Sequence, residues 1–87
     1  MYYVYVIRSQ KDKHFYVGFT SNLEKRLKIH NDGLVESTKP RRPFDMVYYE
    51  ACLNKQDAIH RERYLKSTYG KRYLRNRISN YLLGECP

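Results

Sequence analysis

The chain has 87 residues, of which 41% are hydrophobic and 30% charged, and its formal net charge is +8. This length supports one domain with a single modest core, so we expect one domain over residues 1–87 and no separate regulatory domain. The composition excludes a disordered chain, and no stretch is apolar for long enough to suggest a transmembrane helix.

The first half of the chain predicts a hairpin, a helix and a third strand. "YYVYVIR" (2–8) and "HFYVGF" (14–19) are rich in aromatic and β-branched residues and flank the polar "SQKDK", which predicts a β-hairpin. "SNLEKRLKIHNDG" predicts a helix over about residues 22–31, capped at its N-terminus by Ser21 or Asn22. "FDMVYYEA" (44–51) predicts the third strand.

The second half predicts two helices. Asn54 is the expected N-cap of the first, which carries Glu62, and Gly70 is expected to interrupt it. The final helix is defined by Leu74, Ile78, Tyr81 and Leu82. The order ββαβαα predicts an α+β fold, with a small three-stranded antiparallel or mixed sheet flanked by helices.

The positive charge is concentrated in two segments. Glu62 is the only acid in the basic stretch from Arg61 to Arg77, and "STKPRRP" carries a second basic cluster. Such a surface suits a polyanion such as nucleic acid, whose phosphates it would neutralise with release of counterions. The alternative is a solvated, solubilising face. No segment combines a basic face with a long apolar one, so we expect no membrane partner.

The cysteines and the N-terminus bear on the compartment. Cys52 and Cys86 lie far apart, with no CxxC pair and no cluster of cysteine and histidine, so neither a zinc site nor a disulfide framework is expected. The N-terminal "MYYVYVI" is short, lacks a basic leader and alternates like a strand. We therefore expect a cytoplasmic protein.

Two pairs of residues and one glycine are candidates for a site. An even-length hairpin loop would place Tyr5 directly opposite Tyr16 on one face of the sheet, although simple packing of the two rings is the alternative. Gly18, inside a strand, indicates a bulge or the close approach of a ligand. Arg26 and His30, spaced i,i+4, could hold a phosphate and transfer a proton. They could equally be an edge arginine and a half-buried histidine.

Glu62 is the sharpest candidate, because it lies between Ala58 and Leu65 on the apolar stripe of its helix. A carboxylate there needs a cation, a proton or a metal, since unpaired burial costs roughly several kcal/mol. One alternative is a salt bridge to a neighbouring arginine. Another is Mg²⁺, which accepts one or two protein oxygens beside water molecules and substrate phosphates.

These residues together resemble the GIY-YIG nuclease domain. The resemblance is carried by "YVY" at 3–5 and "YVG" at 16–18, followed by "SNLEKRLKIHN" and "RERYLK", and it covers essentially the whole chain. Within the family, the chain looks like the stand-alone bacterial GIY-YIG proteins. These are similar to the N-terminal nuclease domain of the excision-repair incision subunit.

The resemblance implies a metal-dependent endonuclease that hydrolyses phosphodiester bonds in nucleic acid. DNA is the favoured substrate, with processing of the repair or recombination type. Tyr5 and Tyr16 match the motif tyrosines, one of which acts as general base. Arg26 matches the arginine that neutralises the transition-state phosphate, and His30 matches a helix histidine of part of the family. Glu62 matches the single glutamate that binds one Mg²⁺ or Mn²⁺ ion.

Other residues are expected to contact the substrate. Gly18 would leave room for the strand to approach the phosphate, and Asn76 is the candidate for an asparagine that family nucleases often use. The first tripeptide begins with Tyr3 where the name-giving motif has glycine, which implies a bulkier entrance to the site. The remaining substrate-binding candidates are basic: Lys39, Arg41, Arg42, Lys66 and Arg72.

Two aspects of function stay open at this point. The alternative to an enzyme is a non-catalytic DNA- or RNA-binding module on the same scaffold. Since we expect no separate recognition domain, specificity should be low or should come from a partner protein.

Overall fold

The computed structural model describes residues 1–84. Their elements, in chain order, are β1 (Tyr2–Ser9), β2 (Phe15–Thr20), α1 (Leu23–Asn31), the 3-10 turn η1 (Lys39–Arg41), β3 (Phe44–Cys52), α2 (Lys55–Lys66), α3 (Thr68–Arg77) and α4 (Ser79–Gly84). Cys52 is a free thiol, whereas Cys86 lies outside the described residues. Within residues 1–84, no helix has the length and apolar character needed to cross a lipid bilayer.

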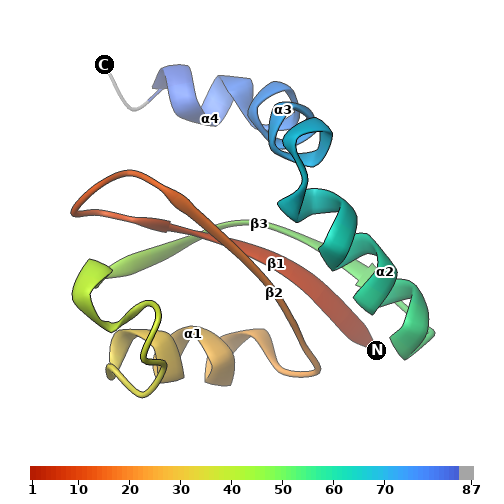
Figure 1. The fold of residues 1–87 in the computed structure, drawn as a ribbon, viewed down its shortest axis with the longest axis horizontal. Coiled ribbons are helices and arrows are strands. Elements are labelled where there is room, and N and C mark those ends of the chain that lie inside the picture. Colours follow the sequence, from red (N-terminus) through yellow and green to blue (C-terminus); the bar gives the residue numbers. More distant parts are fainter. Residues whose placement is uncertain (85–87) are drawn as a thin grey trace.

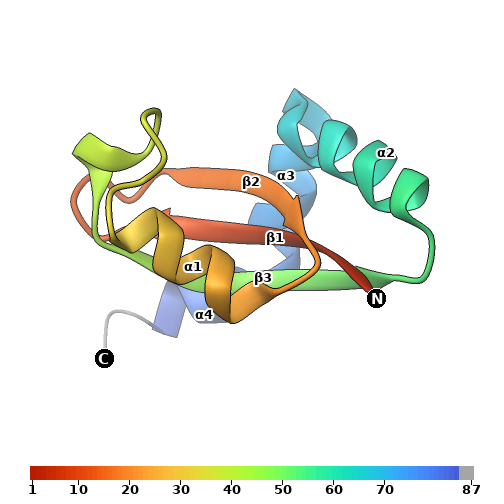
Figure 2. The same cartoon turned by 90° about the horizontal axis from the view of Figure 1, so that it is seen from below.

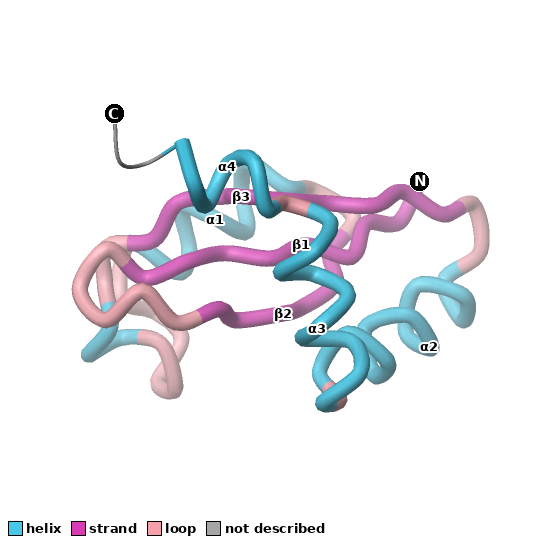
Figure 3. Tube along the Cα trace, turned by 90° about the horizontal axis from the view of Figure 1, so that it is seen from above, coloured by secondary structure: helices cyan, strands magenta, loops and turns pink. Residues whose placement is uncertain are grey.

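The three strands form one antiparallel sheet with β1 at its centre, in the order β2-β1-β3. In Figure 1, α1 lies on one side of the sheet and α2, α3 and α4 lie on the other. Figure 2 shows α1 running across the face of the sheet that it covers, and Figure 3 shows β1 between β2 and β3. The predicted α+β fold with a three-stranded sheet is therefore confirmed, and the sheet is antiparallel rather than mixed.

The hairpin register differs from the prediction. Tyr5 lies opposite Gly18, and Tyr16 lies opposite Ile7, so the two tyrosines are diagonal neighbours rather than a directly opposed pair. The reason is the loop: Ser9 pairs with His14 through backbone hydrogen bonding, which makes the loop residues 10–13, whereas the predicted register requires a loop of residues 10–11 or 9–12. Residues directly opposite share a face, so both tyrosines still point to the α1 side.

Capping residues set the ends of α1 as the sequence predicts. The side chain of Asn22 accepts a hydrogen bond from the Lys25 amide, which satisfies one of the free amides of the first turn. The helix ends at Asn31, and Gly33 follows with φ of +79°, a backbone conformation that glycine adopts without steric cost.

The predicted break at Gly70 is wrong, because the second helix ends earlier. Lys66 is the last residue of α2, and the Ser67 side chain then caps α3 by accepting a hydrogen bond from the Gly70 amide. Gly70 lies inside α3, where a Cβ atom would collide with the backbone of Tyr64. A further break at Ile78 separates α3 from α4, so the order is ββαβααα rather than ββαβαα.

Each face of the sheet has its own core. The α2 and α3 side is apolar, and its buried residues are Val4, Val6, Val17, Ala58, Leu65 and Leu74. The α1 side is built on Tyr5, Ile7 and Phe44, with Leu23 and Leu27 of α1 packed against them. Alternation along β1 explains the division, since successive side chains of a strand point to opposite faces.

Candidate active site

Tyr5 lies on the central strand, but its hydroxyl is carried toward the β2 edge of the sheet. The side chain is 1% exposed and covers Gly18, the residue opposite on β2. A Cβ atom at Gly18 would collide with the Tyr5 hydroxyl and ring. Gly18 therefore makes room for Tyr5, and the open space over β2 that we expected for a phosphate is filled at this position by the tyrosine.

Two residues of α1 contact the Tyr5 hydroxyl. Arg26 Nε donates a hydrogen bond to Tyr5 Oη at 3.2 Å, and Tyr5 Oη lies 2.8 Å from His30 Nε2. The i,i+4 spacing places both side chains on the face of α1 that meets the sheet. His30 is fully buried, whereas Arg26 is half-buried. The predicted grouping of Tyr5, Arg26 and His30 is thus present as a hydrogen-bonded cluster.

The electrostatics of this cluster keep both rings neutral near pH 7. Burial raises the pKa of Tyr5 above its ordinary value, with Arg26 acting in the opposite direction and the nearby charge of Glu62 adding to the rise. Burial, helped by the positive charge of Arg26, lowers the pKa of His30 from 6.5 to about 4. His30 therefore has one ring nitrogen free to accept a proton from a donor.

Tyr16 contacts the same histidine. The ring centroids of Tyr16 and His30 are 5.1 Å apart in an edge-on arrangement, and those of Tyr5 and His30 are 5.8 Å apart. Tyr16 is half-buried and lines an open groove, whereas Tyr5 is buried. The two motif tyrosines therefore share a face and a neighbour, and within residues 1–84 it is Tyr5 whose hydroxyl accepts a hydrogen bond from Arg26.

Glu62 approaches from α2, and its ion-pair partner is a lysine rather than the arginine that we considered. Lys66 Nζ lies 3.3 Å from Glu62 Oε2, and the two side chains are 51% and 17% exposed. The neighbouring Arg61 is occupied elsewhere, because its Nε and Nη2 atoms donate to the two carboxylate oxygens of Glu50 at 2.9 and 3.0 Å. Glu62 is therefore largely shielded from water, and in the described part of the chain its ion-pair partner is Lys66 rather than an arginine.

This carboxylate fits the requirements of one hard divalent cation. Within residues 1–84, no three histidine, cysteine or acidic side chains are close enough together to hold a metal, which excludes an all-protein cage there. Mg²⁺ and Mn²⁺ differ from zinc in accepting one or two carboxylate oxygens, with water and phosphate oxygens completing the shell. Lys66 is a flexible and largely exposed partner that a cation could displace from Glu62.

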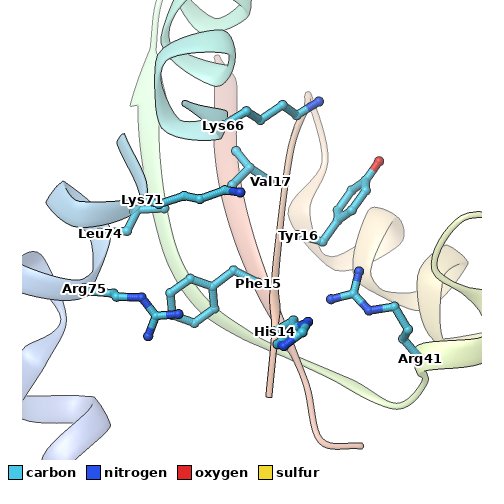
Figure 4. Close-up of a pocket in the computed structure, with 9 residues that line it drawn as sticks. All are labelled: His14, Phe15, Tyr16, Val17, Arg41, Lys66, Lys71, Leu74 and Arg75. Carbon is cyan, nitrogen blue, oxygen red and sulfur yellow. The ribbon is translucent and has the colours of Figure 1, made fainter. Parts of the chain in front are cut away.

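A basic groove of about 490 Å³ runs along β2 beside Tyr16. Figure 4 shows its lining, with Lys71 and Arg75 on one side of the strand and Arg41 on the other. The full lining is His14, Phe15, Tyr16, Val17, Arg41, Lys66, Lys71, Leu74 and Arg75. The Arg75 guanidinium lies over the Phe15 ring, 5.4 Å from its centroid, and Arg41 Nε is 3.1 Å from Asp12 Oδ2.

Several predicted substrate-binding residues do not line this groove. Arg42 Nε donates to the Lys39 carbonyl oxygen, and its guanidinium covers Gly33, which ties it to the loop after α1. Arg72 lies over the exposed Tyr69 ring, 5.8 Å from the centroid. Lys39 and Asn76 are exposed. Of the predicted substrate-binding residues, the groove contains Arg41 and Lys66.

Sequence reasoning missed three residues that shape the site. Thr38 is fully buried and lies 2.9 Å from His30 Nδ1. The Asn31 side chain accepts a hydrogen bond from the Phe44 amide and donates to its carbonyl oxygen, which fixes the end of α1 against β3. Arg75 had a visible signal, because it is spaced i,i+4 from Lys71 in the basic stretch. Thr38 and Asn31 had none.

Comparison with known proteins identifies relatives along most of the chain. The sequence profile of the GIY-YIG catalytic domain matches residues 1–78. The chain is 46% identical over 67 residues to UPF0213 protein CPE1444 of Clostridium perfringens, covering 76% of this chain and 71% of that protein. It is 38% identical over 72 residues to UPF0213 protein YazA of Bacillus subtilis, covering 82% and 72%.

A solved structure is also similar. The solution NMR structure of UPF0213 protein BH0048 from Bacillus halodurans superposes with a TM-score of 0.52 and 32% sequence identity, covering 85% of this chain and 82% of that one. This similarity supports the α+β fold and the three-stranded sheet described above.

Proposed function

Since the chain belongs to the GIY-YIG family of nuclease domains, we propose that it is an endonuclease that hydrolyses phosphodiester bonds in nucleic acid with the help of one Mg²⁺ or Mn²⁺ ion. One observation carries the proposal. Tyr5 and Arg26 form a hydrogen-bonded pair, and Tyr16, which contacts the same histidine as Tyr5, lines a groove together with Lys66, the ion-pair partner of Glu62. In this proposal these groups act as a base, a cationic clamp and an anionic metal ligand.

Arg26 is suited to bind the reacting phosphate. Among the described residues its Nε donates to Tyr5, which leaves the two terminal nitrogens of the half-buried guanidinium for phosphate oxygens. A guanidinium held in place before the reaction stabilises the negative charge that develops on phosphate oxygens in the transition state. Its bond to Tyr5 also keeps that charge close to the hydroxyl.

A tyrosine takes the proton of the attacking water in this proposal. The Tyr5 hydroxyl lies between the cation of Arg26 and the neutral ring of His30, so its own proton can pass to His30 Nε2 as it takes the proton of water, and Arg26 stabilises the negative charge that develops on its oxygen. Tyr16 is the second candidate, because it faces the groove and is half-buried. The cleavage rates of Tyr5→Phe and Tyr16→Phe would distinguish the two candidates.

Glu62 would hold the metal ion. When bound, a divalent cation supplies a Lewis acid that offsets the charge on the phosphate and on the leaving oxygen. The contribution of the chain is to provide one shielded carboxylate, 17% exposed, on α2, which lies on the other side of the sheet from α1 (Figure 1). Lys66 neutralises that carboxylate while no cation is present.

The basic groove would hold the nucleic acid. It begins at Tyr16 and carries the cationic side chains of Arg41, Lys66, Lys71 and Arg75, so a strand lying in it would lead directly to the reacting phosphate. Contacts of this kind neutralise phosphates without reading sequence. DNA is the substrate that we propose, and specificity would come from DNA structure or from a partner protein.

The test is cleavage of a panel of labelled substrates with Mg²⁺, with Mn²⁺ and with a chelator. The panel contains duplex, nicked, branched and single-stranded DNA, together with RNA, because processing of the repair or recombination type acts on irregular DNA. Wild-type protein is compared with Glu62→Ala. We expect metal-dependent cuts in at least one DNA substrate by the wild-type protein and none by the variant.

Two results would overturn the proposal. Metal-dependent cleavage that persists in Glu62→Ala would point to a contaminating nuclease or to a different site. Tight binding of nucleic acid without cleavage of any substrate under either metal would instead identify a binding module on the nuclease scaffold. RNA cleavage in place of DNA cleavage would support the assignment as an endonuclease and change the proposed substrate.

A further inference from the structure

Thr38 lies in the connection between α1 and η1, far from the strand motifs, yet it touches the candidate site. Its side chain is fully buried, and Oγ1 is 2.9 Å from His30 Nδ1 and 3.4 Å from the carbonyl oxygen of Val35. A hydroxyl carries one proton, so it can donate to only one of these two neighbours. The position of that proton decides the state of His30.

The Val35 carbonyl favours one arrangement of the protons at Thr38 and His30. A backbone carbonyl oxygen only accepts hydrogen bonds, so the contact with Val35 is a hydrogen bond only when the Thr38 hydroxyl donates to it. The hydroxyl then has only lone pairs to offer to His30, and His30 Nδ1 carries a proton that it donates to Thr38 Oγ1.

The hydrogen bond from Arg26 to Tyr5 leads independently to the same tautomer of His30. The guanidinium only donates, so Tyr5 Oη accepts from Arg26 Nε. The remaining polar neighbour of Tyr5 Oη is His30 Nε2, at 2.8 Å. If Nε2 carried the proton, Tyr5 would accept twice and its own buried proton would have no acceptor, at the cost of an unmade hydrogen bond. With the proton on Nδ1, each donor in this row of hydrogen bonds has an acceptor.

We propose that Thr38 is a positioning residue that holds His30 in the Nδ1–H tautomer, so that the Tyr5 hydroxyl donates to His30 Nε2 and presents its free lone pair outward. The hydrogen bonds then all run in one direction. Arg26 donates to Tyr5, Tyr5 to His30, His30 to Thr38, and Thr38 to the Val35 carbonyl oxygen. This inference rests on the proposed function only for its consequence in catalysis. The assignment of the tautomer stands on the contacts alone.

The consequence for catalysis follows from the direction of the Tyr5 hydrogen bond. When Tyr5 donates to His30, its oxygen has one lone pair on Arg26 and another for the proton of a water molecule, while its own proton can pass to His30 Nε2. In the other tautomer both lone pairs would be occupied by Arg26 and His30, and the tyrosine could accept nothing further. Thr38 therefore determines whether Tyr5 can serve as a base, although it touches no substrate.

The direct test is the tautomer of His30, read from the ¹⁵N chemical shifts and proton couplings of its ring at pH 7.5. We expect protonated Nδ1 and unprotonated Nε2 in the wild-type protein and in Thr38→Ser, which keeps the hydroxyl. Thr38→Val keeps the shape but removes the acceptor, so we expect Nε2 to be protonated in at least part of the molecules. Thr68→Val, at an exposed position on α3, is the matched control and should match the wild type.

The second readout is kinetic and uses a substrate cleaved by the wild-type protein. Thr38→Val should lower kcat roughly 10-fold to 100-fold with little change in KM, as for residues that orient a catalytic group. Thr38→Ser should restore most of the rate. If no nucleic acid is cleaved, the proposed function fails while the ¹⁵N experiment still decides the tautomer, so the two failures are distinguishable.

Two results would overturn the inference. The first is a wild-type His30 with its proton on Nε2, which needs no variant and holds even if Thr38→Val fails to fold. The second is a folded Thr38→Val protein whose His30 tautomer is the same as in the wild type.

Discussion

The two faces of the sheet are packed by different chemistry. The buried cluster beneath α2 and α3 is entirely apolar and includes Val6, Leu65 and Leu74. The face beneath α1 buries Tyr5, His30 and Thr38, which are polar and joined by hydrogen bonds. Burial of polar groups is tolerated when each one is paired, so the α1 face can keep reactive groups without loss of order.

The difference between the two faces separates the residues that stabilise the fold from those that are held in fixed orientations. Apolar burial stabilises in proportion to area, at about 25 cal/mol per Å², and does so without directional requirements. A buried hydrogen-bonded network adds less net free energy, roughly 1 kcal/mol per bond, but fixes orientations. The α2 and α3 face therefore supplies the cohesion that allows the α1 face to hold Tyr5, Arg26 and His30 in one arrangement.

The two glutamates near the basic helices repeat this contrast. The Glu50 carboxylate on β3 accepts hydrogen bonds from Arg61 Nε and Nη2, and it also accepts one from Tyr48 Oη at 2.9 Å. The Arg61 guanidinium in turn lies 4.8 Å from the Tyr73 ring centroid, which joins β3, α2 and α3. Within residues 1–84, the ion-pair partner of Glu62 is Lys66. The first carboxylate is held by an arginine and a tyrosine, whereas in the proposed function the second binds a cation.

The largest expected effect on stability lies in the apolar core. Leu65→Ala removes a side chain that is 0% exposed beneath α2, and such truncations cost about 2 to 5 kcal/mol of unfolding free energy. Denaturant unfolding monitored by circular dichroism measures the loss. At a temperature where the variant is fully folded, its cleavage rate should equal that of the wild type. A rate that falls with a fully folded variant would contradict the separation of the two faces.

The pH dependence of stability should come from the α1 face. His30 has a pKa of about 4 in the folded protein and 6.5 when unfolded, so below pH 6.5 the unfolded chain binds more protons. Stability should therefore fall as the pH drops from 6.5 to about 4, by up to roughly 3 kcal/mol. Unfolding curves across this range measure it. His30→Gln should lose that slope, while keeping the fall below about pH 4.5 that carboxylates such as Glu50 produce.

The smallest effects are expected in the groove. Lys71→Ala and Arg75→Ala should each flatten the salt dependence of DNA binding by about one unit if each neutralises one phosphate. Fluorescence anisotropy in a Glu62→Gln background measures binding without cleavage. Lys55→Ala with Arg63→Ala removes the same charge from exposed positions outside the groove and is the matched control. If the salt dependence of binding is the same for the groove variants and for the control variants, net charge, and not the groove, attracts the DNA.

The sequence predicted the elements well because local signals mark them. Alternation identified β1, and capping by Asn22 and Asn54 located the starts of α1 and α2. The break at Ser67 was missed because Gly70 offered a stronger local signal. Its true role, the close contact of α3 with the end of α2, depends on tertiary packing that no window of sequence contains.

The site was predicted less completely than the fold. The grouping of Tyr5, Arg26 and His30 followed from helix spacing and from the family resemblance. Thr38 could not be found, because its role arises from a fold-dependent contact with His30 across a loop. The hairpin register was wrong by two residues, since a turn of several polar residues permits more than one pairing.

The most direct test of the central claim compares the metal-dependent cleavage rates of Glu62→Gln and Glu50→Gln. We predict that Glu62→Gln abolishes cleavage and leaves the melting temperature nearly unchanged, because only an exposed lysine loses its partner. Glu50→Gln should keep the rate but melt several degrees lower, since about 1 kcal/mol shifts the melting temperature of a domain of this size by roughly 4 to 8 °C. Equal rates for the two variants, or cleavage that survives Glu62→Gln, would contradict the account.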